Sequence, residues 1–216
     1  MKKITRSQLN TWLDSISKQA KLVAPVESNE NLVYRQIGSV DEIAWGFQKT
    51  IIPPKNWYFP MTESILNIEQ GKTTSITQPP TPERSVVFGV RPCDARSVLA
   101  FDALFLKKSP VDPQYARHRD ALTMIGFSCP KMWDTCFCTA VGGAPNSKDG
   151  LDILLTEIEG GFALEVVTEK GRELIAGLDL EDVEITLEEP QVHSSLPQLR
   201  NSKEWITLLM MYIGSN

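Results

Sequence analysis

The chain has 216 residues, of which 42% are hydrophobic and 23% charged, so it is long enough to bury a core and too apolar to be disordered. Its 27 acidic and 22 basic side chains give a net charge of -5. This balance argues against a nucleic-acid partner, which requires clustered Lys and Arg. The N-terminus lacks the apolar run of a signal peptide, and the longest apolar run, residues 205–213, is about half of a bilayer crossing. We therefore expect a cytoplasmic protein without a membrane segment.

The first 82 residues predict two helices, two strands and two irregular segments. Apolar residues recur at a spacing of three to four from residue 5 to residue 19, which predicts an amphipathic helix. The other elements expected here are strands over residues 21–26 and 31–38, an irregular loop over 51–60, a short helix over 62–70 and a polar, proline-rich loop over 72–82.

Two continuous apolar runs in the middle of the chain each lead to a cysteine. Residues 85–90 predict a strand buried on both faces, followed by Cys93 and by a helix over residues 95–107. Residues 122–127 predict a second buried strand, which ends just before Cys129. In open α/β sheets ligands collect outside the carboxyl ends of the strands. We therefore expect Cys93 and Cys129 to lie side by side where cofactors are normally bound.

The remaining elements complete an α/β domain with a mixed sheet, flanking helices and cluster-binding loops at the carboxyl ends of strands. They are an irregular loop over residues 133–150, a hairpin of strands over 151–157 and 161–167, a helix over 168–178 and a helix over 202–213. We divide the chain into an N-terminal α/β part over residues 1–82 of the same domain, a cysteine-bearing α/β core over 83–190, and a C-terminal tail or helix over 191–216.

The four cysteines predict one metal cluster. Cys93 stands upstream, and Cys129, Cys136 and Cys138 follow as a group with the pattern Cys-x6-Cys-x-Cys. Cytosolic thiols are kept reduced, so disulfides are not expected. Four thiolates are the usual ligand set of an iron–sulfur cluster, whose irons prefer soft sulfur donors. We expect a 4Fe-4S cluster in an electron-transfer protein without substrate chemistry of its own.

Three alternatives to a cluster remain open from the residues alone. The same thiolates can bind zinc and only stabilise an interaction domain of a redox complex. The cysteines can also be scattered core residues, because free Cys is among the most buried residue types. A nucleophilic pair of one thiol with His118 explains only one of the four cysteines.

Residues next to the cysteines extend the expected site. We expect Arg91 to contact the cofactor, because a cation stabilises a reduced, anionic cluster. Asp94 is also named as a cofactor contact, although a cap of the following helix is the preferred interpretation of this residue. Arg96 is interpreted as a solvated surface residue. Trp133 and Phe137 have two interpretations, as a shield of the cluster from water or as core residues.

Several short sequence motifs occur in an order typical of a known family. They are residues 88–96 (Phe-Gly-Val-Arg-Pro-Cys-Asp-Ala-Arg), 126–130 (Gly-Phe-Ser-Cys-Pro), 136–138 (Cys-Phe-Cys) and 150–152 (Gly-Leu-Asp), with Pro54, Lys55, Phe59, Pro60 and Glu63 upstream and Asp102, Phe105, Tyr115, Arg117 and Arg119 between. With these residues the chain resembles, over residues 53–178, the N-terminal domain of a family of electron-transfer iron–sulfur subunits. The family comprises the beta subunits of cytoplasmic sulfhydrogenases and the corresponding electron-transfer component of anaerobic sulfite reductase.

The resemblance implies a component of an oxidoreductase complex that is not itself catalytic. Its partners are then a flavin-containing, NAD(P)-binding reductase and a catalytic metal subunit of the hydrogenase or sulfite reductase type. Members of this family continue into a ferredoxin-like module with further cysteines, whereas this chain has none after Cys138. We therefore expect a chain truncated before that module, or a variant that has only the first domain.

Overall fold

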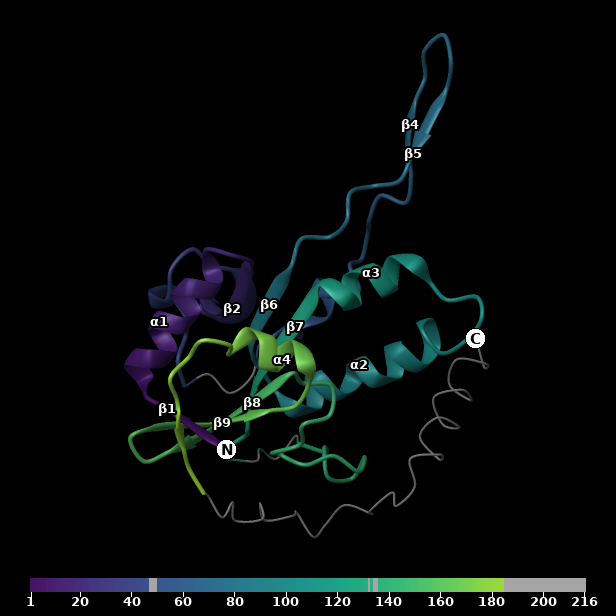
Figure 1. Cartoon of the computed structure of the whole chain (residues 1–216). Coiled ribbons are helices and arrows are strands. Elements are labelled where there is room, and N and C mark those ends of the chain that lie inside the picture. Colours follow the sequence, from purple (N-terminus) through teal and green to yellow (C-terminus); the bar gives the residue numbers. More distant parts are fainter. Residues whose placement is uncertain (47–49, 132, 134–135, 185–216) are drawn as a thin grey trace.

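The structure is a computed structural model, and it describes residues 1–46, 50–131, 133 and 136–184 (Figure 1). In chain order the elements of this part are β1 (Lys2–Ile4), α1 (Arg6–Ser17), β2 (Lys21–Ser28), β3 (Asn31–Gln36), the 3-10 turns η1 (Val40–Glu42) and η2 (Pro54–Trp57), β4 (Asn67–Glu69), β5 (Ser75–Thr77), β6 (Ser85–Val90), α2 (Pro92–Phe105), α3 (Pro113–Ala121), β7 (Leu122–Phe127), β8 (Ile153–Ile158), β9 (Gly161–Val166), α4 (Glu169–Leu174) and β10 (Glu181–Asp182).

The described strands form one mixed eight-stranded sheet and one separate hairpin. The order in the large sheet is β10-β1-β9-β8-β7-β6-β2-β3, and β2, β6, β7 and β8 are parallel to one another. The strands on both sides of this parallel centre are antiparallel. This confirms the predicted α/β class with a mixed sheet. It also confirms that β6 and β7, the strands that lead to Cys93 and Cys129, are direct parallel neighbours.

Helices cover both faces of the sheet, which makes three layers (Figure 1). One core lies between the sheet and α1, with partly buried residues of α4 packed against it, and the second lies between the sheet and α2, α3 and η2. In β6, Val86 and Phe88 belong to the first core and Val87 to the second. Successive side chains of a strand point to opposite faces, so a strand covered on both sides must be apolar throughout. This explains the continuous apolar run in the sequence.

Local sequence signals fix the ends of several elements. Thr5 caps α1 in a capping box, because its side chain accepts from the Gln8 backbone N–H and the Gln8 side chain accepts in turn from the Thr5 N–H. Thr168 caps α4 by accepting from the Gly171 N–H at 3.3 Å. These two helices and the strand pairs β2–β3 and β8–β9 are therefore where the sequence predicts them, although α4 ends four residues earlier than expected.

The prediction was wrong for residues 62–82. The expected short helix and loop contain instead the hairpin β4–β5, which projects from the body of the protein (Figure 1). Leu66 and Ile68 alternate with Asn67 and Glu69, which is the period of two of a strand and not the period of a helix. Helix α3 was not predicted, and the expected helix over residues 202–213 lies outside the described residues.

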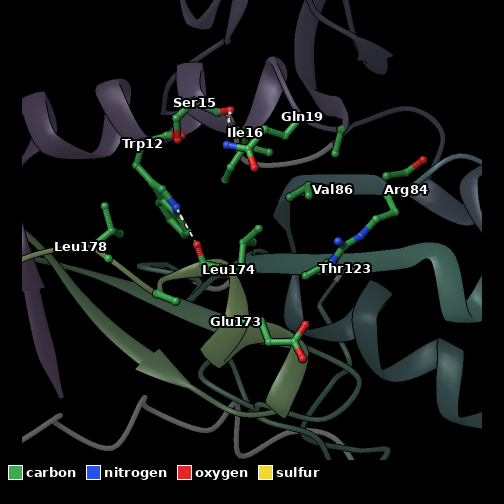
Figure 2. A pocket seen from close by; sticks show the side chains of 14 residues that line it. Trp12, Ser15, Ile16, Gln19, Arg84, Val86, Thr123, Glu173, Leu174 and Leu178 are labelled. Carbon is green, nitrogen blue, oxygen red and sulfur yellow. Dashed lines mark hydrogen bonds between the residues drawn. The ribbon is translucent and has the colours of Figure 1, made fainter.

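A cavity of about 390 Å³ lies between α1 and α4, next to the amino ends of β6 and β7 (Figure 2). Trp12 on its wall donates from its indole N–H to the Leu174 carbonyl at 3.1 Å, and Arg84 and Glu173 also line it. The four cysteines follow the opposite, carboxyl ends of the same strands. The cavity is therefore separate from the site that the cysteines predict.

None of the helices in the described part of the chain is long and apolar enough to span a bilayer.

Candidate metal centre

Cys93 and Cys129 lie just after the carboxyl ends of β6 and β7. The two strands pair in parallel from Ser85 opposite Leu122 to Phe88 opposite Ile125, and the register then shifts at Gly89, which has a φ of +81°. Only glycine adopts such a φ without strain, so it suits this bulge. The chain then turns directly into α2, and Cys93 is the second residue of that helix.

The loop after β7 returns to the strand end through backbone hydrogen bonds. The Cys129 N–H donates to the Pro145 carbonyl at 2.9 Å. The Cys136 N–H donates to the Trp133 carbonyl at 2.8 Å, while the Trp133 N–H donates to the Cys136 Sγ at 3.3 Å. Cys129 is therefore tied to the far end of the loop that carries Cys136 and Cys138, and Cys136 is tied to Trp133.

A second tie fixes the loop around Cys138 to helix α2. The Cys138 carbonyl accepts from the Val141 N–H at 3.2 Å and from the Gly143 N–H at 2.8 Å. The Arg96 guanidinium on α2 donates to the Gly142 carbonyl and lies 3.7 Å from the Asp149 carboxylate. The interpretation of Arg96 as a merely solvated residue was therefore wrong. Its partners are loop backbone and a loop carboxylate, which a sequence read locally does not place beside α2.

The close approach of the loop to α2 also depends on Gly150. A Cβ at this position would lie 2.1 Å from the Ala95 carbonyl oxygen, and the φ of +79° is in the left-handed region. Both facts exclude a side chain here. The loop therefore returns against the first turn of α2, two residues from Cys93.

The four thiols are electrostatic neighbours. The pKa of Cys93 is raised to about 12, mainly by burial and also by the neighbouring Asp94, Cys129 and Cys138, although part of its side chain reaches solvent. The pKa of Cys129 is raised by burial and by Cys138 and Cys136. Burial and Cys136 raise the pKa of Cys138. Each cysteine therefore interacts with at least one of the others, although they come from three separate segments.

Coordination geometry is not reached in the described part of the chain. No group of three or more His, Cys, Asp or Glu side chains there meets the geometry needed to hold a metal ion. All four cysteines are free thiols. Like-charged thiolates repel one another, so their close approach requires a positive centre between them. The arrangement is a set of neighbouring thiols and not yet a closed ligand shell.

Positive charge is supplied by Arg91 and by the start of α2. Arg91 is only 9% exposed, and its guanidinium donates to the Cys129 thiol and lowers the pKa of that group against the effect of burial. Cys93 lies in the first turn of α2, where backbone N–H groups and the helix dipole favour an anion. Both features stabilise thiolates or a reduced cluster at this position.

Asp94 and Tyr34 complete the surroundings of Cys93. Because α2 begins at Pro92, the N-cap is Arg91, so the interpretation of Asp94 as the cap was wrong and it lies in the first turn. The Tyr34 hydroxyl donates to the Gly89 carbonyl at 3.0 Å, at the bulge just before Cys93. Burial and the nearby Asp94 raise the pKa of Tyr34. No motif in the sequence connects Tyr34 on β3 with the cysteines, so it was missed.

The aromatic residues of the loop face solvent. Phe137 is 62% exposed and Trp133 is 44% exposed, with the Lys131 ammonium 5.7 Å from the Trp133 ring centre. Neither expected role, a shield of the thiols or a part of the core, agrees with this exposure. Phe137 lies between Cys136 and Cys138, which are both partly buried, so the chain alternates between inside and outside.

The fold and site define an α/β domain that gathers four free thiols at the carboxyl ends of two parallel strands. The chain is similar to sulfhydrogenase 2 subunit beta from Pyrococcus furiosus, with 28% identity over 164 residues. The aligned part is 76% of this chain and 47% of that protein, so the chain spans about half the length of this relative. This makes it a distant homologue of a sulfhydrogenase beta subunit. No protein-family model and no solved structure matches the chain.

Proposed function

We propose that the chain binds one iron–sulfur cluster through Cys93, Cys129, Cys136 and Cys138 and relays single electrons within a hydrogenase-type complex. The observation that carries the proposal is that four free thiols from three segments lie near the carboxyl ends of β6 and β7, where each influences the charge of at least one other. This is the edge of an α/β sheet at which cofactors are usually bound.

The donor set fits such a cluster. Four thiolates are a complete ligand set for a 2Fe-2S or 4Fe-4S cluster, and all four cysteines of the chain belong to it. Hydrogen bonds at Cys129, Cys136 and Cys138 order the loop that carries these three cysteines without any bound metal. We expect the 4Fe-4S form, in which the cluster supplies one-electron storage, while the protein sets its potential and solvent access.

Arg91 is proposed to raise the reduction potential. Its buried guanidinium already donates to Cys129, and a cation at this distance favours the more negative, reduced state. Arg91→Lys keeps the charge and shortens the reach, whereas Arg91→Met removes the charge and keeps much of the volume. We expect the midpoint potential of the cluster to be highest in wild type, lower in Arg91→Lys and lowest in Arg91→Met. Asp94, which raises the pKa of Cys93, is proposed to act in the opposite direction.

The relative's name describes one component of a sulfhydrogenase and so supports a hydrogenase-type partner, whereas a reductase partner is implied only by the resemblance of the sequence motifs. We propose a flavin-containing, NAD(P)-binding reductase on one side and a hydrogenase-type catalytic metal subunit on the other, in the cytoplasm. A catalytic partner of the anaerobic sulfite reductase type remains a prediction from the sequence motifs. In either complex the chain itself performs electron transfer and no substrate chemistry.

The test is the metal content of protein purified without oxygen. We expect stoichiometric iron and acid-labile sulfide, visible charge-transfer absorption that bleaches on reduction, and an electron paramagnetic resonance signal of the reduced form. Cys138→Ser should lower the iron content, whereas Ser147→Ala in the same loop should retain it. Iron and sulfide below one equivalent of cluster in freshly purified protein would refute the proposal.

The same donor set favours one other function, a zinc-stabilised interaction domain, because zinc also binds four thiolates. Stoichiometric zinc without iron supports that alternative. A metal-free scaffold predicts a third result, in which Cys136→Ala and Cys138→Ala change neither thermal stability nor partner binding. Metal analysis and thermal unfolding of the same preparations separate the three.

A further inference from the structure

The hairpin of β4 and β5 forms an arm that belongs to neither core. We define the β4–β5 arm as residues 61–82, which project from the body beyond α3 (Figure 1). All residues from 61 to 78 are exposed. A two-stranded hairpin with nothing packed on it is at best marginally stable in water. An arm of this kind therefore requires a partner surface for its stability.

One face of the arm is apolar. Ile68 pairs with Ile76 across the hairpin, while their neighbours Asn67 and Glu69 pair with Thr77 and Ser75. Because side chains alternate between faces, the two isoleucines share one face, and Leu66 follows the same alternation. Ile68 is 59% exposed and Ile76 is 63% exposed. The arm is thus amphipathic, but its apolar face has no partner in the described part of the chain.

The base of the arm is fixed to α3 at both legs. The His118 Nε2 lies 2.9 Å from the Glu63 carboxylate on the outgoing leg. Arg117 donates to the Pro79 carbonyl on the returning leg at 2.8 Å. Two consecutive residues of one helix therefore hold both legs. This sets the direction of the arm relative to the sheet, as expected for a docking element and not for a loose loop.

Charge and area indicate what the arm binds. Beyond Glu63 its projecting part, residues 64–80, carries one carboxylate, Glu69, and one ammonium, Lys72, so it is neutral on a chain of net charge -5. Three aliphatic side chains provide on the order of a few hundred Å², below the roughly 800 Å² per partner of a stable independent interface. Two arms from two copies are therefore too small to hold a dimer. Both facts fit an apolar, uncharged groove on a different protein. That protein must also contact this chain at other surfaces.

We propose that the β4–β5 arm inserts its apolar face, Leu66, Ile68 and Ile76, into an apolar groove of another subunit of the electron-transfer complex. The inference rests on the proposed function in one respect, because it takes the partner to be a subunit of that complex. The cluster-binding cysteines take no part in it. Loss of the arm contact should therefore leave metal binding unchanged.

The test uses the complex purified from the native cells through a tag on this chain. The arm variant is Ile68→Thr with Ile76→Thr, which keeps β-branched residues in both strands. The matched control is Ser75→Thr with Thr77→Ser on the polar face of the same hairpin. We expect the arm variant to dissociate from its partner at least about tenfold faster and the control to behave as wild type.

Photo-crosslinking identifies the occupant. A benzophenone amino acid at position 68 should crosslink to one defined subunit, and the same group at position 77 should not. A crosslink from position 68 to a second copy of this chain, equal crosslinking from both positions, or unchanged dissociation of the arm variant overturns the proposal. So does a wild-type chain that purifies without another polypeptide.

The metal content of each variant separates this inference from the proposed function. An arm variant that loses its partner but keeps wild-type iron and sulfide supports both proposals. If wild-type protein contains no cluster and the arm variant still loses its partner, the docking surface stands while the electron-transfer assignment fails.

Discussion

Replacement of Arg96 by Gln tests whether this side chain holds the loop around Cys138 against α2. The guanidinium donates to the Gly142 carbonyl and lies 3.7 Å from the Asp149 carboxylate. A hydrogen bond from a charged donor contributes about 1.5–3 kcal/mol, and a partly exposed ion pair adds about 0.5 kcal/mol or less. Since the Arg96 side chain is 28% exposed, water replaces part of the lost interaction. We therefore expect the loop to lose about 1.5 kcal/mol.

This loss corresponds to about a tenfold increase in local opening. The amide of Gly143, which donates to the Cys138 carbonyl at 2.8 Å, reports it directly by hydrogen exchange. We expect its exchange to accelerate about tenfold in Arg96→Gln, with no change in β6. Iron should also be lost faster from the loaded protein on dilution into chelator, because Cys138 is carried by the loosened loop.

The matched control is Arg172→Gln, which removes an arginine from an exposed pair with Glu169 on α4. This variant should leave Gly143 exchange and iron loss at wild-type values. If Gly143 exchange in Arg96→Gln stays within about twofold of wild type, Arg96 does not hold the loop, and the geometric argument for its role is wrong.

Three further substitutions test the core and the buried polar groups. Gly126→Ala places a Cβ 2.5 Å from Leu151, so we expect a loss of about 2 kcal/mol in urea unfolding, while Gly38→Ala, with its nearest atom at 3.8 Å, serves as the control. Asp152→Ala removes a buried acceptor of a β7 backbone N–H at 2.7 Å and should cost about 2–3 kcal/mol, with Asn intermediate. Burial and a hydrogen bond to a carboxylate raise the pKa of Tyr115. The unfolded chain therefore releases this proton near pH 10, whereas the folded state keeps it to higher pH. This linkage lowers the stability of the fold as the pH rises above about 10. Urea unfolding should show a smaller fall in Tyr115→Phe, and an equal fall in both proteins contradicts this explanation.

The sequence predicted the parts of the fold whose signals are local. The capped, amphipathic α1 and the apolar strands β6 and β7 agree with the prediction, because periodicity and capping act between residues close in the chain. The prediction failed for β4, where a short apolar stretch was taken for a helix. It also failed at the start of α2, which begins at Pro92 because Pro is well accepted in the first turn.

The sequence by itself determined the chemistry available at the candidate site: four thiols, their order, and the two strands that lead to Cys93 and Cys129. Only the tertiary structure decided that Arg96 and Tyr34 belong beside them and that Phe137 faces outward. It also decided that the apolar residues of the β4–β5 arm remain uncovered. These outcomes depend on which surfaces meet when distant segments pack, and neither residue type nor spacing along the chain encodes that contact locally.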